Sequence, residues 1–288
     1  MNARPSTACR PGRISVMRLV PALLKQALRL AFSLAVAYPL YYMVITSLKS
    51  RKDWLSNQFG LPRTISLDNL AQAMSQGRLL VWFRNSVLVT VVAILVSTLL
   101  AALAAFAIVR MRFRGRSAYL NAMISLMVIP PAVLVVPLFG LVVDVGLVNT
   151  IPGLVLVYVG LLLPFSIYLL VAFFRTLPAE LFDAAAIDGC SNARTLWRIV
   201  MPLSAPALVT LVVVNTLWVW NELLVALVFL QSDDLKTLMP ALSLFRGRFA
   251  NNEPLVLTGA LLASLPMVVL YVLGQRFFVR GMTVGAVK

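Results

Sequence analysis

Residues 180–203 read ELFDAAAIDGCSNARTLWRIVMPL, and this stretch decides how the rest of the chain is interpreted. It is polar, rich in alanine and interrupted by one glycine. Long apolar runs without charged residues lie on both sides of it. A short polar segment between two such runs predicts a connection that stays outside a membrane while its neighbours cross it.

The local signals predict a helix–turn–helix in this connection. Pro178 suits the first turn of a helix, and the acid Glu180 suits the positive end of its dipole. Gly189 stands where a helix ends in a left-handed residue. Ser191 then caps a second short helix, which Pro202 limits.

The first of these helices presents small and apolar side chains. Ala184 and Ala185 allow another surface to approach the backbone, and Leu181 and Ile187 offer anchors. Leu196 packs the second helix against the first. A helix seated in a groove of another protein is a common mode of recognition. The alternative is an amphipathic connector that rests on its own bundle.

Composition places the whole chain among membrane proteins. Of its 288 residues, 61% are hydrophobic and only 12% are charged, against about 45–50% and about 25% in soluble domains. Backbone groups in lipid must be satisfied within a helix, so we expect an all-α integral membrane protein. The apolar runs predict six transmembrane helices, at about 30–48, 85–109, 118–142, 152–174, 205–230 and 255–277.

This assignment divides the chain into three parts: a basic amino terminus (1–29), a transmembrane domain (30–278) and a short tail (279–288). A basic region before an apolar run also describes a signal peptide. The run continues well past Ala37, which favours an uncleaved first span. Prolines inside the spans predict kinks, at Pro130, Pro131, Pro137, Pro164 and Pro266.

The net charge of +15 has two readings. Nucleic-acid binding is disfavoured because the basic residues flank apolar runs and have no interleaved aromatic residues. They instead set orientation, since cytoplasmic loops of membrane proteins are rich in Lys and Arg. One side of the six-span arrangement carries 16 basic residues and the other nine, six of them in the loop 49–84. This predicts a multi-pass membrane protein, with both termini and residues 180–203 in the cytoplasm.

Several chemistries are excluded. The chain has no histidine and only two cysteines, Cys9 and Cys190. A His-based triad or proton relay is therefore absent, and a zinc site or disulfide framework lacks ligands. A secondary transporter or channel stays open as the alternative function. It normally needs several ionisable residues within its spans, and Glu222 is almost alone.

The 180–203 segment resembles the EAA loop of ABC-transporter inner-membrane permeases. That pattern is E-A-A, two residues, D-G-A, five residues, F, then I and L-P. The corresponding residues here are Asp183, Ala184, Ala185, Asp188, Gly189, Cys190, Leu196, Ile199, Met201 and Pro202. It departs from the pattern by Asp for Glu at 183, Cys for Ala at 190, Leu for Phe at 196 and Met for Leu at 201.

Three further stretches resemble the carbohydrate-uptake, maltose-type branch of that family. They are AAFAIVRMRFRGR (104–116), WNELLVALVFL (220–230) and FVRGMTVGAVK (278–288). The resemblance extends over roughly 85–288. It implies a permease subunit of the bacterial inner membrane that forms the pathway for a sugar or related polyol and switches by alternating access.

The resemblance also implies partners. They are a second, similar permease in a heterodimer, two cytoplasmic ATPase subunits gripping the loop, and an external solute-binding protein. The chain lacks the G-x-x-x-x-G-K-[ST] pattern of ATP-binding loops. It is therefore expected not to be an enzyme and to bind no cofactor, and the partner ATPase uses ATP with magnesium. In the loop, Asp183 is expected to pair with a basic residue of the ATPase or to stay solvated.

Two more candidate sites lie further along the chain. Trp220, Asn221 and Glu222 could line the pathway, because a charge within a span should face protein or a watery cavity. Alternatively, Glu222 is a tie between helices. The loop 231–254 is a candidate contact for the binding protein or an ordinary connector. The sequence does not identify the sugar.

Overall fold

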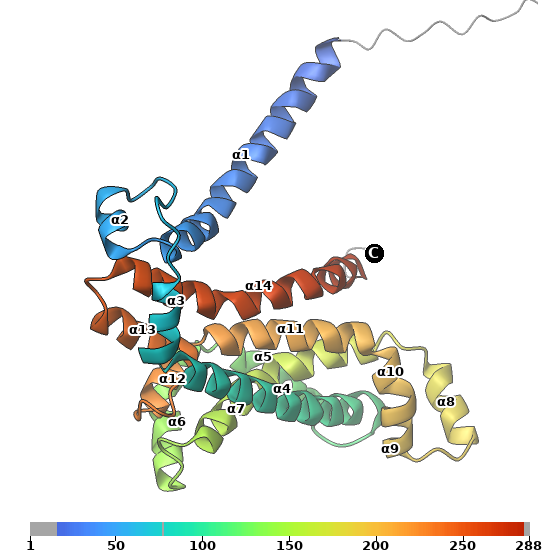
Figure 1. Ribbon diagram of the computed structural model, residues 1–288. Helices are drawn as coiled ribbons and strands as arrows, with labels where there is room; N and C mark the ends of the chain where they lie inside the picture. Colours follow the sequence, from blue (N-terminus) through green and yellow to red (C-terminus); the bar gives the residue numbers. More distant parts are fainter. Residues whose placement is uncertain (1–15, 77, 285–288) are drawn as a thin grey trace, which may run out of the picture.

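The computed structural model describes residues 16–76 and 78–284, which form helices and, within these ranges, no strand (Figure 1). Four helices are long and apolar enough to cross a membrane. Two sharply bent helix pairs raise the number to six if each pair is one span. The predicted all-α membrane fold is thus confirmed.

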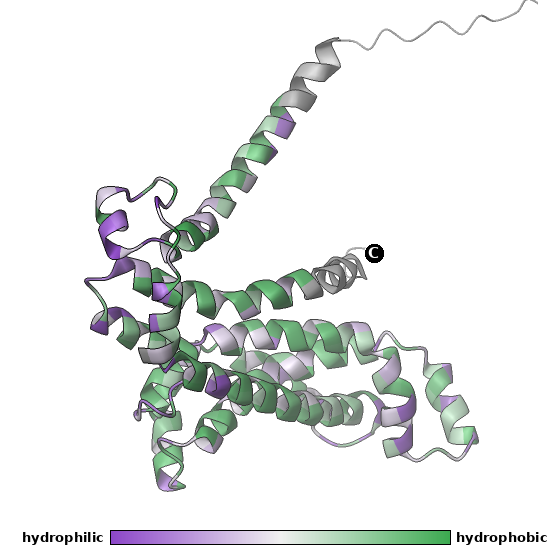
Figure 2. Cartoon of the chain, in the orientation of Figure 1, coloured by the Kyte–Doolittle hydropathy of each residue, from purple (hydrophilic) through white to green (hydrophobic). Residues whose placement is uncertain are grey.

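Four helices lie side by side in the body of the molecule: α4 (Leu79–Arg110), α7 (Ile151–Phe174), α11 (Ala205–Asn221) and α14 (Glu253–Val284) (Figure 1). Their surfaces are apolar along most of their length, and the hydrophilic residues gather towards the ends of the bundle (Figure 2). This distribution is what a lipid environment requires of spanning helices.

Helix α1 (Val16–Ser47) stands apart from this body (Figure 1). It approaches α14 near its carboxyl end and projects away from the bundle. Its apolar section, Leu24–Ser47, is exposed within the chain over most of its length, and Ile45, Thr46 and Ser47 at its end are buried. The amino terminus predicted as 1–29 is helical from Val16, and residues 1–15 lie outside the described part.

The predicted third span, 118–142, is not one helix. Helix α5 (Arg116–Leu126) and helix α6 (Pro131–Asp144) meet at an angle of 109°. Two consecutive prolines cause the break, since Pro131 has no amide hydrogen and each proline disfavours a helical residue before it. Pro137 lies inside the continuous helix α6.

The helix of the predicted fifth span, 205–230, also stops early. Helix α11 ends at Asn221, and a short helix, α12 (Leu224–Phe229), resumes after a break. Pro164 and Pro266 lie within α7 and α14, which continue through them. Neighbouring groups can satisfy the freed carbonyls in such a bundle.

Short elements cover the two ends of the bundle (Figure 1). At one end lie α8 (Ala179–Ile187), α9 (Asn192–Thr195), the π-helical segment η1 (Leu196–Val200) and α10 (Met201–Leu203). At the opposite end lie α2 (Arg51–Ser56), α3 (Asp68–Gln76), α12 and α13 (Leu238–Arg248).

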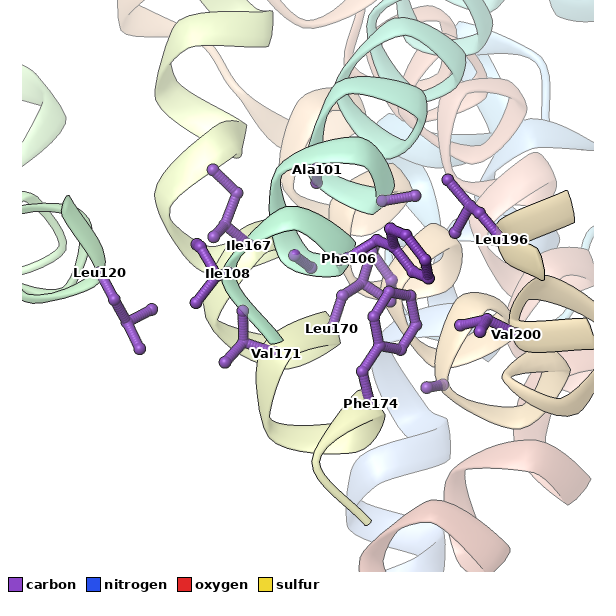
Figure 3. Packing of buried hydrophobic residues seen from close by; sticks show 14 of the residues in the cluster. Ala101, Phe106, Ile108, Leu120, Ile167, Leu170, Val171, Phe174, Leu196 and Val200 are labelled. Carbon is purple, nitrogen blue, oxygen red and sulfur yellow. The ribbon is translucent and has the colours of Figure 1, made fainter. Parts of the chain in front are cut away.

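A buried apolar cluster links the first of these ends to the long helices (Figure 3). Ala101 and Ala105 of α4 are fully buried, and their small side chains let α4 and α7 approach closely. Phe106 and Phe174 extend the cluster to the ends of the helices, where Leu196 of η1 joins it. The short helices at this end are therefore part of the same packed body as the spans.

Candidate functional site: the connection between α7 and α11

The turn after α8 is closed by the backbone. Gly189 has φ of 70°, the left-handed conformation that the sequence predicts for it. The amide of Gly189 donates to the carbonyl of Ala186 at 3.1 Å, and the amide of Cys190 donates to that of Ala185 at 2.9 Å. These two bonds form a Schellman motif, which satisfies the last carbonyls of the helix. The turn is therefore a fixed corner.

The second half of the connection begins as predicted. The Oγ of Ser191 accepts from the amide of Arg194 at 3.3 Å and caps α9. The helix then widens into the π-helical turn η1 and continues through Pro202 to Leu203. It meets α11 at an angle of 78°. One short bend at Ser204 therefore joins this segment to α11.

One face of this connection is packed against the bundle. Phe182 and Ala185 of α8 are buried, as are Leu196 and Val200 of η1. All but Ala185 belong to the cluster in Figure 3, together with the ends of α4 and α7. Ala185 was expected on a face open to another protein. Its exposed fraction is 3%, so it contacts its own chain instead.

An ion pair and an aromatic contact hold α8 to the end of α4. The guanidinium of Arg110 lies 3.7 Å from a carboxylate oxygen of Asp183. The same guanidinium lies 5.5 Å from the centre of the Phe182 ring, which itself neighbours Phe106. Asp183 therefore has a partner within its own chain, where the sequence suggested one on another protein.

The other face of the connection is open. Ala184, Asp188 and Gly189 are exposed, and Ile187 at the tip exposes 86% of its surface. Pro202 is exposed further along. An isolated apolar side chain on a fixed helical corner, with small residues beside it, is suited to a shallow groove on another protein.

Glu222 lies at the break between α11 and α12. Its carboxylate accepts from the amides of Val225 at 2.9 Å and Ala226 at 3.0 Å, which caps α12. One of the two oxygens also accepts from the hydroxyl of Tyr158 on α7, at 2.8 Å. Glu222 is therefore the tie between helices that the sequence offered as the alternative to a pathway residue.

The two residues before Glu222 point elsewhere. Trp220 is buried, its indole nitrogen lies 3.3 Å from the carbonyl of Ala263 on α14, and its ring meets Phe83 edge to face. Asn221 is exposed and donates to the carbonyl of Leu217 in its own helix. The structure does not bring Trp220, Asn221 and Glu222 together around one space, and their role in a pathway stays a prediction.

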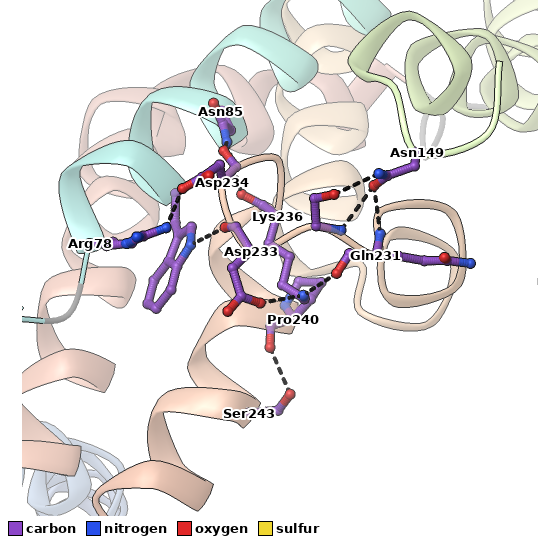
Figure 4. Close-up of polar contacts among 11 residues, drawn as sticks. Arg78, Asn85, Asn149, Gln231, Asp233, Asp234, Lys236, Pro240 and Ser243 are labelled. Carbon is purple, nitrogen blue, oxygen red and sulfur yellow. Dashed lines mark hydrogen bonds and ion pairs between the residues drawn. The ribbon is translucent and has the colours of Figure 1, made fainter.

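At the opposite end of the bundle, the segment 231–237 is held by polar contacts (Figure 4). Asn85 of α4 donates to the carbonyls of Asp234 at 2.8 Å and Lys236 at 3.1 Å. Arg78 pairs with Asp234. Asn149 accepts from two backbone amides of the segment, at 2.9 Å each.

Lys236 stabilises the segment 231–237 through contacts with other residues of the same segment. Its ammonium, largely buried, lies 2.7 Å from a carboxylate oxygen of Asp233 and donates to the carbonyl of Gln231. The hydrogen bond from Lys236 to the Asp233 carboxylate and the positive charge of Lys236 lower the pKa of Asp233 from its ordinary value. The first part of the loop 231–254 is thus held in place by its own chain, and its contact with a binding protein stays a prediction.

Several residues that shape these sites gave no clear sequence signal. Arg110 stood out only as one of four arginines between two spans. Tyr158 lies within an apolar run, where an isolated polar residue is the only hint, and Asn85 stands between Arg84 and Ser86 at the start of a predicted span. Phe182 directly precedes the first matched position of the loop pattern, and it carries the inward packing of α8.

Comparison with known proteins gives consistent matches. Residues 97–284 match the family described as binding-protein-dependent transport system inner membrane component. The melibiose/raffinose/stachyose import permease protein MelC of Bacillus subtilis (strain 168) is 36% identical over 251 residues, covering 87% of this chain and 91% of that protein. The diacetylchitobiose uptake system permease protein DasC of Streptomyces coelicolor is 32% identical over 256 residues, covering 88% and 93%.

The fold matches as well. The crystal structure of a bacterial ABC transporter involved in the import of the acidic polysaccharide alginate contains a chain with a TM-score of 0.79. That match covers 93% of this chain and all of the other, at 22% identity.

Proposed function

The chain belongs to the family of binding-protein-dependent transport system inner membrane components. We propose that it carries a sugar or related polyol through the membrane. We also propose that residues 175–204, the connection between α7 and α11, couple this transport to ATP hydrolysis by a partner subunit. Membership makes it a multi-pass inner membrane permease subunit of an ABC importer and not an enzyme. The substrate class, the coupling contact, the orientation and the subunit count are the proposed parts.

The coupling proposal rests on one observation: one face of the connection is buried against the bundle, and the other is exposed. Phe182, Leu196 and Val200 fix it to the core of the bundle, while Ile187 stands free at its corner. A partner that holds the corner and moves it displaces the ends of α4, α7 and α11 together. Alternating access needs such a contact, because only an element that differs between two states can bias them.

The proposed assembly places this corner in the cytoplasm. Two ATPase subunits grip it and the matching corner of a second permease, and these subunits supply the ATP and magnesium chemistry. A heterodimer encloses the pathway between the two permeases. The fixed segment 231–237 and α13, at the opposite end, then face the solute-binding protein.

A sugar is supported by the relatives, whose names specify import of melibiose, raffinose and stachyose or uptake of diacetylchitobiose. The named sugars differ between the two relatives. Such a range indicates that the shared permease fold does not itself fix the choice of sugar. Selection then belongs largely to the binding protein and the second permease.

The test is uptake by the reconstituted assembly. Vesicles containing this chain, its second permease and the ATPase are supplied with the loaded binding protein and labelled oligosaccharides. We expect uptake only with internal ATP and binding protein present. Uptake driven by an ion gradient without ATP would instead support the secondary transporter.

A further inference from the structure

The loop 48–67, between α1 and α3, has its polar groups inside. Lys49 is fully buried, and its ammonium donates to the carbonyls of Asn57 at 2.8 Å and Gln58 at 3.1 Å. The carboxylate of Asp53, also buried, accepts from the amide of Arg63 at 3.0 Å. A buried ammonium with carbonyl partners is a costly arrangement that fixes the loop around it.

A tight turn at the tip completes this frame. The Asn57 side chain accepts from the amide of Gly60 and donates to the carbonyl of Leu61, both at 2.9 Å. A Cβ on Gly60 would lie 2.3 Å from the Asn57 oxygen, so a larger residue there would displace the Asn57 side chain and break these hydrogen bonds. These contacts fix the conformation of the loop, and they thereby determine which of its side chains face outward.

The large side chains that the loop 48–67 exposes are apolar. Large side chains point outward with exposed fractions between 63% and 74%: Leu55, Phe59, Leu61 and Ile65. Water-facing loops normally show the reverse arrangement. A gathered set of exposed apolar side chains marks a surface that meets another apolar phase.

The surroundings indicate that this phase is lipid. The loop starts directly after α1 ends at Ser47, at the corner of the bundle farthest from α8 (Figure 1). The Phe59 ring lies 6.0 Å from the ring of Tyr42 on α1, and the Trp54 indole donates to the Tyr42 hydroxyl. Tyr and Trp gathered at the end of an apolar helix are typical of the membrane–water boundary.

The charges agree with this position. Arg51, Lys52 and Arg63 are exposed, and Arg63 reaches only within 3.9 Å of Asp53. Asp53 is the one acid between 48 and 67, and it is buried. The exposed face of the loop is therefore cationic beside its apolar residues, the combination that seats amphipathic segments on phospholipid.

We propose that the loop 48–67 is an interfacial membrane anchor. Leu55, Phe59, Leu61 and Ile65 enter the boundary of the acyl chains, and the exposed cations bind headgroup phosphates. This also accounts for five of the six basic residues in the loop 49–84, which runs against the charge rule for the non-cytoplasmic side. Lys49 and Arg78 serve structure there, and the three exposed cations of the loop serve lipid binding.

Depth-dependent quenching tests the anchor in the full chain. Cys9 and Cys190 are replaced by serine, and a fluorescent label is attached after Phe59→Cys, after Ile65→Cys or, as the control, after Gln231→Cys. The protein is placed in vesicles of phosphatidylethanolamine and phosphatidylglycerol. We expect lipids with a nitroxide near the headgroup to quench the labels at 59 and 65 at least about twofold more than the label at 231.

Iodide on both sides of the vesicle should quench mainly the control label. Adding Lys52→Glu and Arg63→Glu should weaken the lipid quenching of the label at 59. Iodide quenching of both loop labels without lipid quenching would overturn the proposal. Protection from both quenchers, or protection that appears only with the binding protein, would overturn it in favour of a protein contact.

Discussion

At the scale of single residues, Gly189 is the position where backbone conformation bears most directly on the proposed coupling. Its φ of 70° lies in the left-handed region, which costs a β-branched residue most. A Cβ added at this position would meet no other atom within 4 Å, so the strain of a substitution lies in the backbone alone. Gly189→Val should leave the protein in the membrane and lower sugar uptake and substrate-stimulated ATPase activity.

Gly189→Asn supplies the matched control for this prediction. Asparagine adopts the left-handed conformation far more readily than valine does. It should therefore retain most of the coupled activity although it adds a larger polar group. Normal substrate-stimulated ATPase activity in the valine variant would contradict the role given to this corner.

Glu222 and Tyr158 allow a second test at this scale, of a structural tie rather than a pathway contact. Glu222→Ala removes the cap of α12 and the acceptor of the Tyr158 hydroxyl. We expect a loss of about 1–3 kcal/mol in stability, the usual cost of unpaired buried polar groups. Thermal unfolding in detergent measures it.

Tyr158→Phe removes only the contact between helices and should cost less. The double variant should cost less than the sum of the two single changes, because the residues share one hydrogen bond. Additive losses, together with a change in which sugar is carried, would instead favour a pathway role for Glu222.

At the scale of elements, the attachment of α8 to α4 determines how motion at the corner reaches the spans. Arg110→Ala removes both the ion pair with Asp183 and the contact with the Phe182 ring. An exposed ion pair contributes about 1 kcal/mol or less, so we expect coupled ATPase activity to fall by no more than about fivefold.

Arg112→Ala is the matched control, since Arg112 is exposed in the same stretch and has no ion pair among the described residues. Expression and basal ATPase activity should be unchanged in both variants. Equal effects of the two variants would show that general basic charge, and not the α4–α8 contact, is responsible.

Among the elements, those with local sequence signals were predicted and those set by tertiary packing were not. The corner at Gly189 and the cap at Ser191 follow from local chemistry, and the structure confirms both. The prediction that Ala185 faces another protein was wrong, because tertiary packing, and not the helix's own residues, determines which face of a short helix is buried. The 109° turn between α5 and α6 likewise exceeds the kink that proline signals predict, since hydropathy cannot separate one span from two half-helices.

At the scale of the whole molecule, the described residues reduce a conflict in the charge distribution. The loop 49–84 carries six basic residues on the side that the charge rule keeps poor in them. Lys49 is buried within its loop and Arg78 is paired with Asp234, so neither acts as a free topological charge. The side that holds α8 keeps the arginines between α4 and α5, none of which is buried.

This distribution predicts orientation, and two cysteine variants test it. With Cys9 and Cys190 replaced by serine, a membrane-impermeant maleimide should label Ile187→Cys only from the cytoplasmic side and Gln231→Cys only from outside. Both positions are exposed, and they lie at opposite ends of the bundle, so either result reports the whole arrangement. Permeabilised cells, in which both positions should react, provide the control. Labelling of residue 187 from outside would remove the corner from the reach of any cytoplasmic ATPase, and the coupling proposal would fail with it.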